Sequence, residues 1–480
     1  MLPETRRPRR PQKRTRTAPR PGTALLALLA LALALSPGRP ARGAESGPPP
    51  SYVREQVLER PVPLRRDIGN SHETVTTASP DAQRYYDQGL NYLESFAWIE
   101  AARSFHQALR LDPNLALAHV GLSYAHSGFE NTEGAKYYLR RAKALAAGDG
   151  PAARITDHER RRIEIRERQI VAMDDLSNRG KREAYRKAID EALAAHPDDP
   201  VFWLLRGTAS EPYASGQGQR GGAASLPYYR HVLNLVPDDA SAHHYLAHTF
   251  ETMGPPDSAV AHAGAYLRLA SSVPHAAHMM GHAFRRAGRI DEAIAQFQRS
   301  DSLERAYFAA EGIDPASDWH HAHNLQLLAT SYQQIGRVDL AERALRELAT
   351  LGAGEADRAF NRKELPNFLI HRGRYQEALE EAEGMAQTRY PQSRSVGHAL
   401  AGRALLGLGR IGAAGRELDA AERELTIVPR SVLPLEPSRS QVEPWVKELR
   451  NAYSKAAGPA TSIAAPTQDP RARAASRCCT

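Results

Sequence analysis

The chain has 480 residues, of which 42% are hydrophobic and 25% charged, a balance typical of globular proteins and unlike that of disordered or fibrous chains. Its formal charge of +8 comes from the N-terminus, because residues 1–44 hold ten Lys and Arg against one acid and the remaining residues carry −1. The composition therefore gives no support to nucleic-acid binding, and we expect no nucleic-acid partner.

Residues 1–43 have the pattern of an export signal. The basic stretch RRPRRPQKRTRTAPR precedes the apolar run Ala24–Leu35, and the small-residue stretch SPGRPARGAES follows. The run is shorter than the roughly 20 residues of a membrane-spanning helix and matches the apolar core of a signal peptide. We expect cleavage near Gly43, a periplasmic or secreted protein, and no stable membrane insertion after cleavage. Residues 44–80, rich in Pro and Ser, are expected to be a linker.

A pattern of small and large residues recurs along the rest of the chain. A small residue is followed by a large residue at +3, small residues at +12 and +19, and a large residue at +16. The clearest copies start at Gly89, Gly281, Ala329 and Gly402. This pattern resembles the tetratricopeptide repeat, in which each copy is one antiparallel pair of helices.

The spacing has a physical explanation. Small residues at 0, +12 and +19 let two helices approach, and the large residue at +16, such as Phe105 or Phe297, fills the space between them. A glycine at +7, such as Gly288, opens the turn, and a proline at +24, such as Pro113, ends the second helix. Because one pair cannot bury its own apolar face, successive pairs stack.

The resemblance implies an all-α, right-handed superhelical solenoid of about nine helix pairs over residues 81–457. A last helix, VEPWVKELRNAYSKAA, is expected to cap the array, and residues 458–480 are expected to be a disordered tail. Several copies are looser than the others. The charged stretch TDHERRRIEIRERQI is expected to form a solvated helix face.

Ten of the nineteen histidines fall within residues 243–323. A helix turns about 100° per residue, so positions −6, −3, +1 and +4 form one stripe, which lines the concave groove in this repeat family. The residues on this stripe that we select as candidate binding residues are His244, His248, Glu251, His275, His278, His282, Arg285, His323 and Gln326. His243, His262, His320 and His321 lie in the same segment but off this stripe.

Three interpretations of the histidines remain open. They pack between helices and bond to nearby carbonyls, they bind a metal, or they recognise an anionic or C-terminal peptide group with help from Arg285. For a metal, His244, His248, His278 and His282 are the candidate ligands, since imidazoles spaced by four residues suit Zn²⁺ or another divalent ion. Asp314, Asp318 and Glu311 either orient imidazoles or act as helix caps and turn residues.

The sequence contains no nucleophile elbow, paired-histidine zinc protease motif, dinucleotide-binding glycines or cysteine ligand set, so it gives no catalytic residue. It resembles exported bacterial tetratricopeptide proteins with HYL-H and H-H-H first helices, a group to which no reaction is assigned. The predicted function is an exported scaffold that binds a protein or peptide in the histidine-rich groove. The alternative is a metal-binding protein or a metal-dependent hydrolase.

Overall fold

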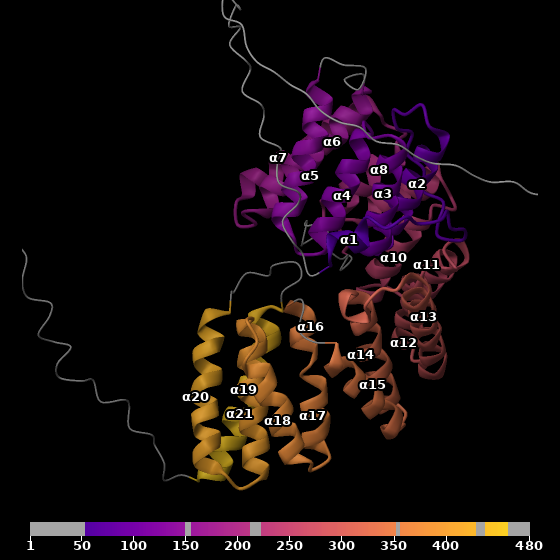
Figure 1. The fold of residues 1–480 in the computed structure, drawn as a ribbon. Coiled ribbons are helices and arrows are strands. Elements are labelled where there is room, and N and C mark those ends of the chain that lie inside the picture. Colours follow the sequence, from indigo (N-terminus) through magenta and orange to yellow (C-terminus); the bar gives the residue numbers. More distant parts are fainter. Residues whose placement is uncertain (1–52, 149–154, 212–221, 352–355, 429–436, 459–480) are drawn as a thin grey trace, which may run out of the picture. The chain divides into compact units, whose positions relative to one another are not determined.

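The computed structural model describes residues 53–148, 155–211, 222–351, 356–428 and 437–458 (Figure 1). The predicted signal peptide at 1–43 and residues 459–480 of the predicted tail lie outside these ranges. Within them, helices and turns account for the regular structure and no strand occurs, in agreement with the predicted all-α class.

The helices follow the chain in the order given in Figure 1. They are α1 (Glu55–Leu58), α2 (Pro80–Glu94), α3 (Trp98–Leu111), α4 (Ala116–Gly128), α5 (Thr132–Ala147), α6 (Asp157–Met173), α7 (Arg179–Ala195), α8 (Pro200–Thr208), α9 (Leu226–Leu235), α10 (Ala240–Thr252), α11 (Pro256–Leu269), α12 (Pro274–Arg286), α13 (Ile290–Glu311), the short helix η2 (Pro315–Ser317), α14 (Trp319–Gln334), α15 (Val338–Thr350), α16 (Ala356–Asn361), α17 (Glu364–His371), α18 (Tyr375–Ala386), α19 (Pro391–Gly407), α20 (Ile411–Ile427) and α21 (Arg439–Ala457). Consecutive helices pack as pairs, for example α2 on α3, α12 on α13 and α19 on α20.

The predicted role of the small residues is confirmed where glycine meets an aromatic ring. A Cβ added at Gly89 would lie 2.6 Å from the ring of Phe105, and a Cβ at Gly281 would lie 2.5 Å from the ring of Phe297. Both rings come from position +16 of the same copy and are fully buried. The helices of each pair can therefore approach only because the first helix carries no side chain there.

The glycines at position +7 have the backbone conformation that a turn requires. Gly288, Gly336 and Gly409 have φ of +75°, +74° and +72°. This left-handed conformation costs an ordinary residue free energy because its Cβ approaches the backbone, whereas glycine adopts it readily. The turns between paired helices are thus fixed by residue type.

Residues 53–79, the described part of the predicted linker, are packed against the helices. We call this segment the strap. Val53, Leu58 and Ile68 of the strap are buried. Its backbone bonds to the turn after α11, with Gly69 N donating to Leu269 O at 3.1 Å and Ser272 N donating to Asp67 O at 2.9 Å. The Pro-rich composition led to the expectation of a linker, but proline prevents regular helix and strand without preventing packing.

The prediction that α6 forms a solvated face holds for one side of the helix, where Arg160, Glu164 and Arg168 are exposed, but not for the other. Four of its polar side chains are almost fully buried, and they are Glu159, Arg162, Arg166 and Gln169. Arg162 Nε donates to Glu73 Oε1 of the strap at 2.6 Å, and Arg166 donates to the hydroxyl and carbonyl oxygens of Ser123. Burial is tolerated because these partners satisfy most of the donors.

The last described helix, α21, packs on α19 and α20 and buries Val442, Val446 and Leu449.

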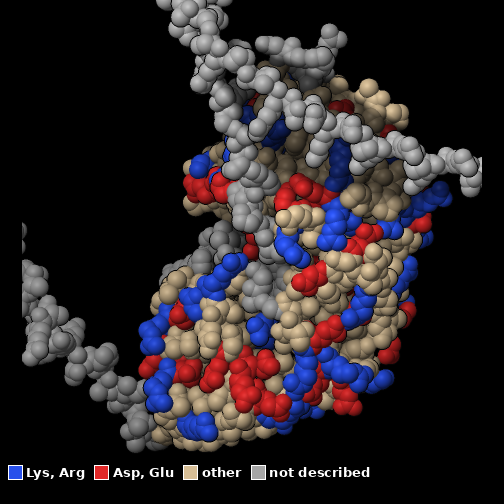
Figure 2. All heavy atoms as spheres, in the orientation of Figure 1, with Lys and Arg blue, Asp and Glu red and all other residues tan. Residues whose placement is uncertain are grey.

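On the face drawn in Figure 2, acidic and basic side chains lie next to one another. Ion pairs join some of the charged helices, for example Arg374 with Glu342 and Glu377. No helix among the described residues is both long and apolar enough to cross a membrane.

Candidate functional site

Histidines from three successive first helices meet at one place. Helix α10 contributes two, α12 contributes three and α14 contributes two. These residues, which we call the histidine cluster, are His244, His248, His275, His278, His282, His320 and His323. They meet because most of them occupy equivalent repeat positions on helices that contact one another, α10 with α12 and α12 with α14.

One end of the cluster is a triad formed by His244, His248 and His275. Nε2 of His244 lies 2.9 Å from Nε2 of His275 and 3.1 Å from Nε2 of His248. His244 and His275 are buried, whereas 14% of the His248 side chain is exposed. For comparison, ligand nitrogens about 2.1 Å from a tetrahedral zinc ion are about 3.4 Å apart.

The other end is a triad formed by His278, His282 and His323, whose ligand atoms all lie within 4.8 Å of one another. Nε2 of His278 and Nε2 of His282 are 2.9 Å apart. His320 lies between the two ends and forms a third group with His275 and His278. The group with His320 shares His275 with the first triad and His278 with the second. The two end triads share no residue, so two separate ions can occupy them at the same time.

Hydrogen bonds behind the second triad fix the protonated nitrogen of its rings. His278 Nδ1 lies 2.9 Å from Oδ1 of Asn324, and the amide nitrogen of Asn324 donates to Phe297 O at 2.9 Å, which fixes the orientation of the amide. His282 Nδ1 lies 2.5 Å from a carboxylate oxygen of Glu251. Both Nδ1 atoms are therefore donors, and the two Nε2 lone pairs point at each other at 2.9 Å. A proton on one of the rings, or a metal ion coordinated by both nitrogens, would satisfy this contact.

The first triad has the same arrangement at His244. Its Nδ1 lies 2.7 Å from the carbonyl oxygen of Glu94, which can only accept, so Nδ1 is the donor. Its Nε2 then offers one lone pair to both His248 and His275. One proton can satisfy only one of these two contacts.

Protonation is an unfavourable way to supply the cation. Burial, together with the charges of neighbouring rings, holds the pKa of His244, His275 and His278 well below the usual value and lowers the pKa of His323 to about 3. Burial alone would raise the pKa of Glu251, but the neighbouring histidines hold it well below the usual value. The cluster therefore contains buried imidazoles that resist protonation, His244, His275, His278 and His323, close to an ionised carboxylate.

Aromatic side chains cover the cluster. The ring of Phe96, in the turn between α2 and α3, lies 4.8 Å from His244 and 5.4 Å from His275. Phe96 has φ of +58°, a conformation that few non-glycine residues adopt. Its carbonyl accepts from Trp319 Nε1 at 3.1 Å, and Trp319 stacks on His323. These rings reduce water access and strengthen electrostatic interactions inside the cluster.

No protein-family model matches the sequence, and no curated protein does. Solved structures with similar helix arrangements exist. A tetratricopeptide repeat protein from Parabacteroides merdae covers 60% of this chain and 100% of its own, at 13% identity and a TM-score of 0.39. PilF from Pseudomonas aeruginosa covers 49% and 92%, at 18% identity and a TM-score of 0.34. YrrB, described as a TPR protein with an unusual peptide-binding site, covers 41% and 91%, at 17% identity and a TM-score of 0.29.

These likenesses concern the arrangement of helices alone. The paired helices, the glycine–phenylalanine contacts and the left-handed turn glycines carry the assignment of the fold. The chain has the tetratricopeptide-repeat fold.

The tetratricopeptide stripe brings most of the predicted groove residues together. Arg285 and Gln326 remain half-exposed beside the cluster, and Gln326 Nε2 lies 3.5 Å from a carboxylate oxygen of Glu364. Three residues expected to line an open groove, His244, His275 and His278, are instead buried. They are buried because Phe96 and Trp319 cover the stripe, and the repeat pattern carries no information about either side chain.

The four predicted metal ligands do not form one set. His244 and His248 lie in one triad, whereas His278 and His282 lie in the other. Each of the two pairs is completed by a histidine that was not among the four, His275 or His323. The four-residue spacing identified the pairs His244/His248 and His278/His282. The distance between α10 and α12 could not be predicted from that spacing.

The sequence pattern missed His320 and its carboxylate partner Glu304. Helix α14 begins ten residues before its small residue Ala329, whereas α12 begins only seven residues before Gly281. Helix α14 is therefore longer at its N-terminus by almost one turn, and this extension places His320 in the cluster. His320 Nδ1 bonds to Glu304 Oε1 of α13. The spacing of His320 and His323, one turn apart on one face, was the local signal that His320 lies near the cluster.

The three carboxylates considered as imidazole partners have other roles. Asp318 caps α14 by accepting from the backbone of His320 and His321, and Asp314 caps η2. Glu311 forms ion pairs with Arg65 and Arg103. A further group of possible ligands, Asp301, Glu304 and His321, lies behind the cluster on α13 and α14.

Proposed function

We propose that the protein binds divalent transition-metal ions in the histidine cluster and that the tetratricopeptide scaffold positions the ligands. The observation that carries this proposal is the contact between His278 and His282. Both rings are held as Nδ1 donors, so their facing Nε2 atoms are two lone pairs at 2.9 Å. A metal ion coordinated by both nitrogens satisfies both lone pairs at once, and burial opposes a proton on His278.

The donor chemistry narrows the class of metal. Neutral imidazoles suit Zn²⁺, Cu²⁺, Ni²⁺ and Fe²⁺, whereas Mg²⁺ and Ca²⁺ prefer oxygen ligands. Two triads provide for up to two ions, and Glu251 contacts one ring from each triad, at 2.5 Å for His282 and 3.7 Å for His248. Three imidazoles leave a fourth coordination position, which a catalytic metal requires, so a metal-dependent hydrolase is a narrower form of the same proposal.

The test is metal analysis of protein purified without an affinity tag. We expect one to two equivalents of a transition metal in the unmodified protein and a loss of most of it in the double variant His244→Ala/His278→Ala, which removes one ligand from each triad. Titration with Co²⁺ provides a second readout, because its absorption bands report the number of nitrogen ligands directly.

The matched control is His371→Ala, which removes an exposed histidine of α17 outside the cluster. This variant should keep the metal content of the unmodified protein. Metal-free protein that binds no added Zn²⁺, Cu²⁺, Ni²⁺ or Co²⁺ would contradict the proposal. A double variant that folds and retains full metal content would contradict the assignment of the site.

A protein or peptide partner remains a second candidate, supported by the half-exposed side of the cluster. His282, Arg285, His323 and Gln326 each keep part of their surface open there. Such a partner would contact these residues and leave the buried rings untouched. Loss of co-purifying peptide in an Arg285→Ala/Gln326→Ala variant with unchanged metal content would separate this function from metal binding.

We also propose that the protein is exported, on the basis of the basic and apolar pattern of residues 1–43. The mature N-terminus, determined by mass spectrometry of protein from the periplasm or medium, should begin near residue 44. Recovery of the intact N-terminus only from the cytoplasm would refute export.

A further inference from the structure

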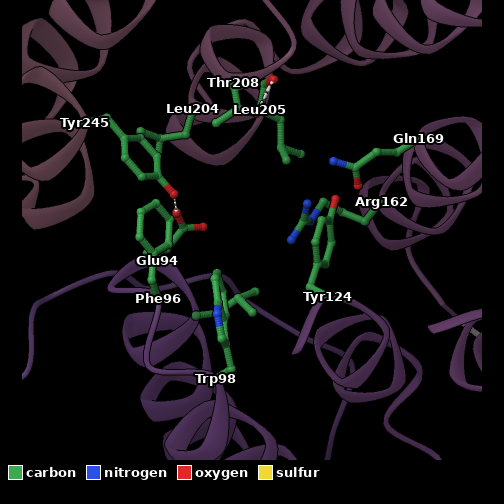
Figure 3. Close-up of a pocket in the computed structure, with 11 residues that line it drawn as sticks. Glu94, Phe96, Trp98, Tyr124, Arg162, Gln169, Leu204, Leu205, Thr208 and Tyr245 are labelled. Atoms are coloured by element: carbon green, nitrogen blue, oxygen red, sulfur yellow. Dashed lines mark hydrogen bonds between the residues drawn. The ribbon is translucent and has the colours of Figure 1, made fainter. Parts of the chain in front are cut away.

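A cavity of about 50 Å³ lies between α2, α4, α6, α8 and α10, next to the histidine cluster (Figure 3). Its polar lining comes from Glu94, Tyr124, Arg162, Gln169, Thr208 and Tyr245. A buried water needs about 10–15 Å³ of such space, so the cavity holds about three to five non-hydrogen atoms. Its size is that of a very small organic molecule.

One wall of the cavity presents a guanidinium that is paired with Glu73 and keeps one donor without a partner in the described ranges. Arg162 is 3% exposed, and its Nε donates to Glu73 Oε1 at 2.6 Å. Nη1 of Arg162 is buried and has no hydrogen-bond partner among the described residues. An unpaired buried donor costs about 1–3 kcal/mol, and more when it is charged. This wall therefore favours a ligand with an anionic acceptor.

The opposite wall presents a carboxylate. Figure 3 shows Glu94 and Arg162 facing each other across the cavity, and Tyr245 Oη donates to Glu94 Oε2. No ion pair within 4.0 Å joins Glu94 to Arg162 in the described part of the chain.

We propose that this cavity binds a small zwitterion of the size of glycine, with its carboxylate on Arg162 and its ammonium on Glu94. A ligand with both charges can accept from the Nη1 donor of Arg162 and pair with the Glu94 carboxylate at once, and such contacts are strong in a cavity of low dielectric constant. A ligand with one charge leaves the other wall unpaired. The aromatic side chain of Trp98, which also lines the cavity, is a favourable neighbour for an ammonium group.

This inference does not depend on the metal proposal. Only the backbone carbonyl of Glu94 contacts the histidine cluster, through His244 Nδ1, whereas its carboxylate faces the cavity. A change in the Glu94 side chain therefore removes the cavity carboxylate and leaves the cluster contact in place.

The experiment measures binding of glycine to the purified protein by saturation-transfer NMR and calorimetry. Propionate has the same five non-hydrogen atoms with a methyl group in place of the ammonium, and propylamine lacks the carboxylate. We expect saturable binding of glycine and at least about tenfold weaker binding of propionate and propylamine, as is typical when a charged hydrogen-bond partner is lost. Equal binding of propionate and glycine would overturn the zwitterion assignment, and no saturable binding of glycine would overturn the site.

Two variants locate the site. Glu94→Gln should weaken glycine binding by about tenfold or more, with metal content unchanged, whereas Glu133→Gln, an exposed glutamate of α5, should have no effect. Leu205→Phe should fill the cavity and abolish binding without removing any charge. Circular dichroism establishes that each variant is folded, and glycine binding that survives in folded Leu205→Phe would refute this location.

Discussion

The contact between Gly281 and Phe297 makes a sharp test of the repeat packing. In Gly281→Ala the new methyl carbon would lie 2.5 Å from Cε1 of Phe297. Ordinary contacts between carbon atoms are about 3.5–4.0 Å, so the ring or the helix has to move by about 1 Å. Because Phe297 is fully buried, the ring has no open space to enter.

The magnitude follows from comparison with a second glycine. Overpacking of a core costs about 1–3 kcal/mol, whereas Gly→Ala inside a helix gains about 0.5–1 kcal/mol. Gly264 lies inside α11, and a Cβ there would have only Arg268 Nη1 nearby, at 4.0 Å. The gain from replacing glycine by alanine inside a helix is common to both variants and cancels in the comparison. Gly281→Ala should therefore be less stable than Gly264→Ala by about 1–3 kcal/mol, the cost of overpacking.

Urea unfolding followed by circular dichroism measures this difference. Gly264→Ala should unfold at slightly higher urea than the unmodified protein, and Gly281→Ala at lower urea. Phe297→Leu should relieve the clash, so Gly281→Ala should cost less in that background. Equal stability of the two glycine variants, within about 0.5 kcal/mol, would refute the proposed packing.

Two further predictions concern ionisable groups. Glu251→Gln should weaken metal binding about 10–100-fold, because its carboxylate orients His282 of the second triad. Glu417→Gln, which alters the His398–Glu417 pair of α19 and α20, should leave metal binding unchanged, and equal metal affinity in the two variants would contradict this role of Glu251. Burial lowers the pKa of the two histidines of α4, to about 3 for His119 and about 4 for His126. Their contribution to the free energy of unfolding is therefore complete above pH 6.5. It is lost as the pH falls toward those values, by about 1.4 kcal/mol per pH unit for each group. A urea midpoint that does not change between pH 7 and pH 5 would contradict this assignment.

The paired helices could be predicted from the sequence because each copy of the repeat makes the same helix–helix contacts at the same spacing. A glycine at position 0 and a phenylalanine at +16 can be read from one copy and checked in another, as with Gly89 and Phe105. The same regularity put His244, His248, His278 and His282 on one stripe. Local spacing therefore identified two of the three histidines in each triad.

The remaining features depend on contacts that do not repeat. Phe96 covers the cluster from a turn about 150 residues away in the sequence, and its contact with His244 has no local signal. The charged face of α6 was expected to be solvated because periodicity shows which residues share a face and not what packs on it. Arg162 is buried because Glu73 of the strap lies beside it.

The strap changes how the repeat array should lose its structure. In an ordinary solenoid each pair contacts only its neighbours, so end pairs can melt separately and the rest persists. Here Arg103 of α3 forms an ion pair with Glu311 of α13 at 2.8 Å, and Gly69 bonds to Leu269. Segments that are two hundred residues apart in the sequence thus support one another, and melting of the first pair would also remove Phe96 from the histidines. The histidine cluster and the N-terminal pair therefore belong to one cooperative unit, and the arrangement of the histidines should be lost when either end of that unit opens.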